Sequence, residues 1–397
     1  MEIWIPLLYP ILAGAVGLYF FKHKVVWQEA VIPVGVSILF IAVFRFFVVT
    51  SMTSDVEYWG GTVQKVEYYE SWNEYIHQIC YRECCCDSDG KNCSTESYDC
   101  SYVEYHSEYW QITDNNDLTA TISQSEYTRL ALQFKQQPKF VELNRNYYTE
   151  DGDKYEFYWQ GEKETFEPMY TEHNYENRVQ ASHSVYNYPE VSEEDVNTFG
   201  LYKYPAVSNL KQQTILGSDS KIHAKAEKEF TWLNSTLGEL KELRMWVLIF
   251  KDKIPSAGQM QERYWKGGND NEFIVCIGTD SEYSVNWCHT FSWSEAQEPK
   301  IKIRDFVMKQ DSLDLMALAE FSYKELSEKY VRKDFKDFSY LTVDPPAWAI
   351  LWCHIITLVI TVSVTIWAIS NDVDHDDFGR GYSIKNRFSG RGYQSRW

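Results

Sequence analysis

Six of the nine cysteines in this 397-residue chain lie between Cys80 and Cys100, in the run CYRECCCDSDGKNCSTESYDC. Thiols at this density form disulfides in an oxidising compartment or bind a metal ion. Residues 87–92 favour a turn, and the flanking segments alternate like strands. A hairpin centred on Gly90 therefore places Cys80 opposite Cys100.

The same hairpin places Cys86 opposite Cys93, to within one residue of register. Because directly opposed strand residues are close enough for a disulfide, we predict the bridges Cys80–Cys100 and Cys86–Cys93. A zinc ion held by four thiolates is the alternative, although the spacing lacks the paired CxxC motif of common zinc sites. Free thiols remain a third interpretation.

A second pair, Cys276 and Cys288, is symmetric about Glu282 in the turn Thr279-Asp280-Ser281-Glu282. A hairpin folded about that turn would join the two by a disulfide. Two separate buried thiols explain the pair equally well.

These residues lie in a long polar segment that is bracketed by apolar stretches at residues 3–21, 30–50 and 347–370. Each stretch has about the 20 residues that a helix needs to cross a bilayer. Lys22 and Lys24 separate the first two stretches, and short cytoplasmic connections retain such cations. We therefore expect the N-terminus and residues 51–346 outside and the C-terminus in the cytoplasm.

The tail at residues 371–397 agrees with this topology. It is rich in Gly, Arg and aromatic residues, and its cations are Arg380, Lys385, Arg387, Arg391 and Arg396. Such a segment can bind anionic lipid or nucleic acid, and we favour a contact with a neighbouring protein or with a second copy of the chain.

The expected ectodomain carries 51 acidic and 30 basic side chains, and aromatic residues make up 16% of the whole chain. Its negative charge repels phosphate backbones, which argues against nucleic-acid binding by the ectodomain. The charge suits divalent cations or a basic protein partner instead.

Periodicity divides this ectodomain into parts. Residues 51–207 are Cys-rich and show the period-two pattern of antiparallel strands, and residues 208–220 form a polar linker. In residues 221–343, apolar strands and amphipathic helices alternate, as in an α/β layer. The expected helices there are 222–240, 257–265 and 312–330, and the expected strands are 244–250, 272–279, 284–292 and 300–304.

The run ERYWKGGNDNEFIVCIGTDSEYSVNWCHTFSW, with the helix and the strand VLIF before it, is similar to TPM domains, which are membrane-tethered α/β modules. The whole chain also resembles uncharacterised membrane proteins of bacteria and their viruses. Together with the apolar stretches and the period-two pattern, the resemblance indicates an α+β membrane protein with three transmembrane helices, an antiparallel β unit and a TPM-like unit. It also implies a location in a bacterial inner membrane or a virion membrane.

Some TPM proteins are phosphatases or bind cations, so the resemblance makes Asp270, Asp280 and Glu282 candidate ligands of calcium or magnesium. They fall at turns at opposite ends of one expected strand, which disfavours a shared ion. We therefore expect a non-enzymatic interaction subunit that contacts the bilayer, other envelope proteins or a second copy of itself. The alternative is a divalent-cation-dependent envelope phosphatase.

Overall fold

The computed structural model of this protein describes residues 2–20, 27–86, 93–143, 151–210, 212–217 and 220–370. The chain folds into two compact units. One unit combines Met1–Ser54 and Phe338–Trp397 with the short segment Glu176–Ser184, and the other contains Asp55–Tyr175 and Val185–Asp337.

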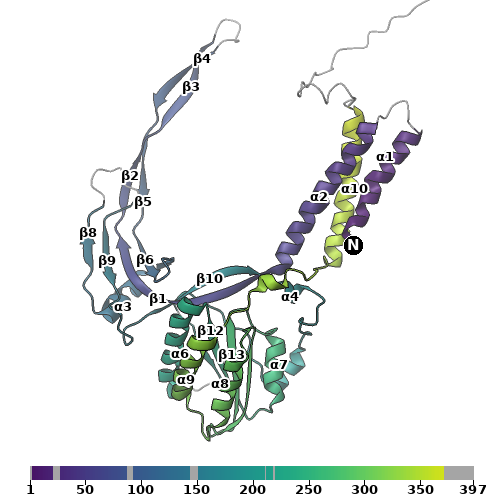
Figure 1. The fold of residues 1–397 in the computed structure, drawn as a ribbon. Helices are drawn as coiled ribbons and strands as arrows, with labels where there is room; N and C mark the ends of the chain where they lie inside the picture. Colours follow the sequence, from purple (N-terminus) through teal and green to yellow (C-terminus); the bar gives the residue numbers. More distant parts are fainter. Residues whose placement is uncertain are drawn as a thin grey trace, which may run out of the picture. The chain divides into compact units, whose positions relative to one another are not determined.

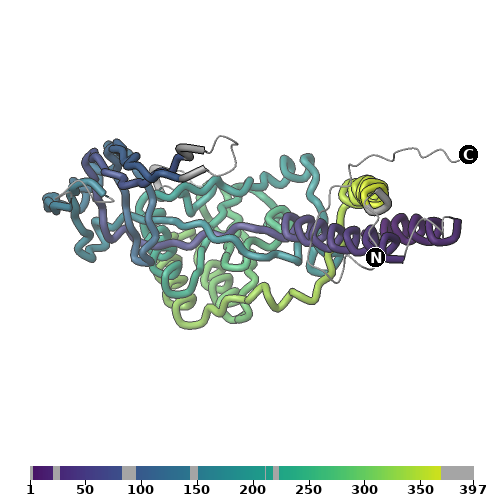
Figure 2. The backbone as a smooth tube through the Cα atoms, turned by 90° about the horizontal axis from the view of Figure 1, so that it is seen from above, coloured from purple at the N-terminus to yellow at the C-terminus, as the bar shows by residue number. Residues whose placement is uncertain are grey.

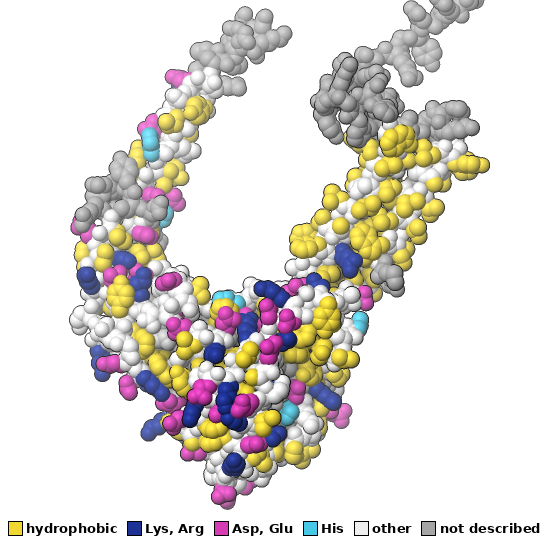
Figure 3. All heavy atoms as spheres, in the orientation of Figure 1, with side chains coloured by type: hydrophobic (Ala, Val, Ile, Leu, Met, Phe, Trp, Pro, Cys, Tyr) yellow, Lys and Arg dark blue, Asp and Glu magenta, His cyan; other side chains and the backbone are white. Residues whose placement is uncertain are grey.

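The first unit is built from apolar helices: η1 (Glu2–Leu7), α1 (Leu8–Phe20), α2 (Trp27–Thr53) and α10 (Ala347–Ser370). Within the described residues, three segments are long and apolar enough to cross a membrane, namely Ile3–Phe20, Trp27–Thr53 and Ala347–Trp367. Helices α1 and α10 both pack against α2 (Figures 1 and 2). Hydrophobic side chains dominate their visible outer surface (Figure 3), as expected of helices that face lipid.

Few side chains are buried between these helices. Ile3, Ile41 and Cys353 form the small core, and the Tyr9 hydroxyl shares a hydrogen bond of 2.8 Å with Nδ1 of His354. Helix α4 (Arg178–Ala181) joins this unit through its N-cap residue Asn177, whose backbone N–H donates to the Thr53 carbonyl at 2.6 Å.

The second unit contains a sheet around the long strand β1 (Ser54–Tyr69), with the order β7-β6-β1-β9-β8 and with β10 also paired to β1. The other strands are β6 (Tyr109–Asp114), β7 (Thr119–Ile122), β8 (Lys139–Val141), β9 (Lys154–Tyr158) and β10 (Pro168–Glu176). Helix α3 (Gln124–Phe134) buries Leu130 and Phe134 in the core of this sheet. It begins at a capping box formed by Ser123 and Glu126.

The same unit contains a second sheet, in the order β11-β12-β13-β14. Strands β11 (Ile215–Leu216), β12 (Arg244–Lys251) and β13 (Glu272–Thr279) are parallel, and β14 (Val285–Ser292) is antiparallel. Helices cover both faces of this sheet. One face is covered by α6 (Ser220–Lys241), α8 (Glu298–Met308) and α9 (Leu315–Lys329), and the other by α5 (Glu193–Phe199) and α7 (Ser256–Tyr264). The 3-10 turn η2 (Phe335–Phe338) follows.

The apolar run of β12 follows from this layering. Met245, Val247 and Ile249 belong to the core on one face of the sheet, and Trp246, Leu248 and Phe250 belong to the core on the other. A strand that is covered on both sides needs apolar residues at every position. The mixed α+β fold class that we expected is therefore confirmed.

Two local expectations for this sheet are wrong. The segment at residues 300–304, expected as a strand, lies inside helix α8, where Ile303 and Val307 enter the core one turn apart. The segment expected as a polar linker contains the buried edge strand β11, whose Ile215 and Leu216 pair with Val247 and Leu248.

The two sheets meet where strand β1 crosses helix α6. A Cβ atom added to Gly238 would lie 2.3 Å from the Gly60 carbonyl oxygen, and one added to Gly60 would lie 2.3 Å from the carbonyl oxygen of Asn234. Backbone therefore packs directly on backbone, and only glycine allows so close an approach.

We expect Gly238→Ala to destabilise the protein by roughly 1–3 kcal/mol, as overpacking does. Alanine normally stabilises a helix by about 1 kcal/mol relative to glycine, so the sign is the opposite of the helix-propensity effect. Thermal unfolding of the detergent-solubilised full chain measures the change. Gly35→Ala in α2, where no atom lies within 4 Å of the added Cβ, is the control. A Gly238→Ala protein as stable as the wild type would contradict the backbone contact.

Candidate functional site: a disulfide-braced aromatic ribbon

Two short two-stranded sheets follow one another in the Cys-rich region. Strand β2 (Trp72–Ile76) pairs with β5 (Tyr102–His106), and β3 (Ile79–Cys86) pairs with β4 (Cys93–Asp99). We call residues 72–86 and 93–106 the ribbon. Figure 1 shows it as paired strands that no helix covers. An isolated two-stranded sheet is only marginally stable in water, so the ribbon needs an additional constraint.

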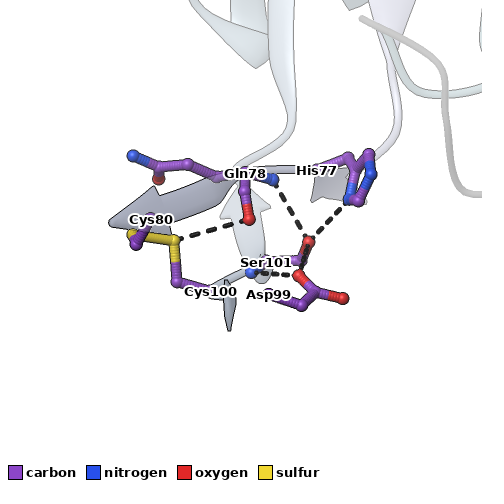
Figure 4. The surroundings of a disulfide bond; sticks show 6 residues. All are labelled: His77, Gln78, Cys80, Asp99, Cys100 and Ser101. Atoms are coloured by element: carbon purple, nitrogen blue, oxygen red, sulfur yellow. Dashed lines mark hydrogen bonds between the residues drawn. A yellow bond between two sulfur atoms is a disulfide. The ribbon is translucent and has the colours of Figure 1, made fainter. Parts of the chain in front are cut away.

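The disulfide Cys80–Cys100 provides that constraint, and this prediction is confirmed. The bond lies where the two short sheets meet (Figure 4), and it joins Cα atoms 5.8 Å apart. Backbone N–H of Cys100 donates to the Gln78 carbonyl at 3.0 Å. The Ser101 hydroxyl donates to Asp99 and shares a hydrogen bond of 2.8 Å with Nδ1 of His77.

The strand register differs slightly from the one that we expected. Cys80 pairs with Tyr98 rather than with Cys100, so the disulfide joins a diagonal pair of residues across the two strands. The backbone of Cys86 pairs with that of Cys93, as the hairpin model requires. The side chains of Cys84, Cys85, Cys86 and Cys93 lie outside what the structure describes, so the second bridge stays a prediction.

Apolar side chains are exposed along the ribbon. Val103 and Tyr105 are 60% and 68% exposed, and they share one face of the β2–β5 pair with Tyr75. Ile79 and Tyr81 are 54% and 74% exposed on the β3–β4 pair. Large aromatic side chains with so much free area are typical of protein interfaces.

The charge on the ribbon is mainly negative. Among its described side chains the carboxylates are Glu74, Glu96, Asp99 and Glu104, and the one arginine is Arg82. Arg82 already pairs with Glu96 at 3.1 Å and lies 5.5 Å from the centroid of the Tyr98 ring. The ribbon therefore combines exposed aromatic surface with unneutralised negative charge.

The three candidate cation ligands do not come together. Asp270 precedes β13 and is 2% exposed, whereas Asp280 and Glu282 lie in the turn after that strand. Oδ1 of Asp280 accepts hydrogen bonds from the backbone N–H groups of Glu282 and Ser284, which hold its pKa below the usual range. The residues that the structure describes contain no cluster of three His, Cys, Asp or Glu side chains suited to a metal ion.

Asp270 instead belongs to a buried ionic cluster that sequence reasoning missed. Nη2 of Arg332 donates to Asp270 and to both carboxylate oxygens of Glu57, each at 2.7 Å. Nη1 of the same guanidinium contacts Glu242. Burial, together with the neighbouring Asp270, raises the pKa of Glu57 to about 8. No spacing signal connects Glu57 with Arg332, because they lie in distant parts of the sequence.

The disulfide between Cys276 and Cys288 is not formed; both thiols are free, which is the alternative interpretation of this pair. Cys276 pairs with His289, and Cys288 pairs with Ile277. The one-residue offset turns the two side chains to opposite faces of the sheet, where they pack into different cores. Burial raises the pKa of Cys276 well above its usual value, as expected of an inert core thiol.

The tail cations Arg380, Lys385, Arg387, Arg391 and Arg396 lie outside the described residues. Comparison of the chain with protein-family models, with curated proteins and with solved structures finds no match. The candidate site therefore has to be judged from its own geometry.

Peptide mapping without reductant tests the ribbon's covalent structure. After tryptic digestion, we expect residues 66–82, which contain Cys80, to be linked to residues 92–129, which contain Cys100. Attachment of residues 83–91 to the same product would report the second bridge. Cys80→Ser should release residues 66–82 as a free peptide, and Cys276→Ser should change nothing. Unlinked peptides from the wild type would rule out the Cys80–Cys100 bond.

The Glu57 cluster predicts a pH-dependent stability. A carboxyl group whose pKa rises from 4.5 to about 8 on folding contributes stability below pH 4.5, and that contribution is lost as the pH rises through 8. We therefore expect the thermal midpoint of Glu57→Gln, relative to the wild type, to increase as the pH is raised from 5 to about 8. Glutamine cannot titrate, which is why the variant escapes the loss.

The exposed-turn variant Glu282→Gln is the control for this titration, and its midpoint should follow that of the wild type at every pH. A constant difference between Glu57→Gln and the wild type would show that Glu57 has an ordinary pKa in the folded protein.

Proposed function

We propose that this chain is a membrane-anchored, non-enzymatic interaction subunit of a bacterial envelope or virion-membrane assembly. Its ribbon presents an acidic aromatic surface to a basic partner protein. The observation that carries the proposal is the exposure of Tyr81, Val103 and Tyr105 on paired strands with an excess of carboxylates. Burying them against a partner removes apolar area from water and supplies the packing that the ribbon lacks.

The proposal places residues 51–346 outside the membrane and the C-terminus in the cytoplasm. Two independent features support this topology. Lys22, Lys24 and the tail cations are arranged as the positive-inside rule requires. The disulfide Cys80–Cys100 belongs in an oxidising compartment, which the cytoplasm is not.

The TPM-like character of residues 221–343 is likewise a proposal. It is supported by the order helix α6, strand β12, helix α7, glycine turn, strand β13 and strand β14. A cation-dependent phosphatase would need Asp270, Asp280 and Glu282 around one ion. Arg332 neutralises Asp270, and the other two lie in a turn beyond the opposite end of β13, so enzymatic activity forms no part of the proposal.

Photo-crosslinking in intact membranes tests the interaction. We expect a photoreactive amino acid at Tyr105 to give a discrete adduct with a basic protein, or one of twice the chain's mass if the partner is a second copy. Leu132 on α3 is the matched control, because it is 76% exposed but lies outside the ribbon. Equal labelling from both positions, or none from Tyr105, would exclude the ribbon as the interaction surface.

A further inference from the structure

A pocket of about 370 Å³ opens in the second unit, between helix α7, strand β14 and helix α8. Its volume lies within the range of small-molecule sites. Its lining combines aromatic side chains with ionisable ones: Tyr188, Glu262, His289, Phe291, Trp293, Lys300 and Arg304. The ribbon contributes none of these residues, so the pocket is independent of the proposed interaction surface.

Glu262 in this pocket already has two partners. Its Oε2 is 2.7 Å from Nε2 of His289, and its Oε1 accepts the Tyr188 hydroxyl at 2.9 Å. Burial alone would raise the pKa of Glu262, but the hydrogen bonds from His289 and Tyr188 outweigh it and lower the pKa. Glu262 is therefore an ionised group whose two carboxylate oxygens are both paired within the protein.

The cations of the pocket are less completely paired. Lys300 donates to the Ser292 carbonyl at 3.0 Å, and among the described residues it forms no ion pair with a carboxylate. Burial lowers the pKa of Lys300, and the nearby carboxylate of Glu262 offsets this only in part. Arg304 lies one turn further along α8, where its only carboxylate neighbour within the described residues is Asp305, at 2.8 Å.

The aromatic wall depends on a glycine. Gly267 has a φ of 84°, and a Cβ atom there would lie 2.9 Å from Nε1 of Trp293 and 3.0 Å from Cε2 of Tyr188. The Trp293 ring is fixed by a hydrogen bond of 3.1 Å from its Nε1 to the Gly268 carbonyl. The turn thus holds two rings at one side of the pocket, with Phe291 also in the lining.

We propose that this pocket binds a small organic anion, in which one carboxylate or phosphate group is carried on a planar apolar body. Lys300 and Arg304 bind the anionic group, and the rings of Tyr188 and Trp293 contact the body. The lining has more cationic than anionic side chains, in a chain whose formal net charge is −19. The ammonium group of Lys300, which forms no ion pair among the described residues, is the charge that a bound anion would neutralise.

Calorimetric titration of the detergent-solubilised full chain tests this site with phenyl phosphate and benzoate as probes and benzyl alcohol as the neutral control. We expect saturable binding of at least one anion and none of the alcohol. The stronger of the two anions identifies the head group as phosphate or carboxylate. Lys300→Gln and Arg304→Gln should each weaken binding roughly tenfold or more, because each removes a charge-assisted contact.

Lys302→Gln is the matched control on the same helix, because Lys302 pairs with Glu298 and Glu325 and does not line the pocket. The Lys302→Gln protein should bind the anions with the same affinity as the wild type. Binding that survives both Lys300→Gln and Arg304→Gln, equal binding of benzyl alcohol, or no binding of either anion would each overturn the proposal. Arg304 is exposed and Lys300 is partly buried, and unchanged thermal midpoints would show that both variants fold normally.

Discussion

The contact between Gly60 and Gly238 determines how the second unit is assembled. Strand β1 is shared by two structures: its beginning lies against helix α6, and from Val63 onward it is hydrogen-bonded between β6 and β9. Because backbone packs on backbone at the crossing, a shift of β1 that brought Trp59 to the place of Gly60 would force a side chain into a space that has no room for a Cβ. The register of β1 is therefore fixed where the two sheets meet.

This register also explains the ionic cluster. It brings Glu57, three residues before Gly60, to Arg332, which also binds Asp270 and Glu242. One guanidinium thus faces three carboxylates, two of them almost fully buried, and the shortage of positive charge is met when Glu57 retains a proton. Asp270 is held inside the protein by this arrangement and is not free to bind a cation with Asp280.

The sequence predicted the strands and helices whose positions depend on the spacing of neighbouring residues. The bounds of β13, expected at residues 272–279, follow from its apolar run and the turns on either side. Residues 300–304 (KIKIR) were wrongly predicted as a strand because five alternating residues fit that pattern. The helical spacing of Ile303 and Val307 is visible only over a longer window. The Cys276–Cys288 pairing failed because an irregularity after Gly278 shifts the register, and symmetry about a turn cannot reveal a bulge. The Arg332 cluster and the α7–β14–α8 pocket combine segments too distant in sequence to leave any spacing signal.

The distribution of charge separates two surfaces of this protein. The ribbon has exposed aromatic side chains and carboxylates, and within the described residues its paired strands are braced by the disulfide Cys80–Cys100. The pocket, by contrast, lies between packed elements and offers Lys300 and Arg304 in a chain of strongly negative net charge. A basic protein attracted to the ribbon is repelled by the pocket's cations, and a small anion repelled by the ribbon is attracted by them. If both proposals hold, the opposite signs allow each surface to select its own ligand without competition from the other.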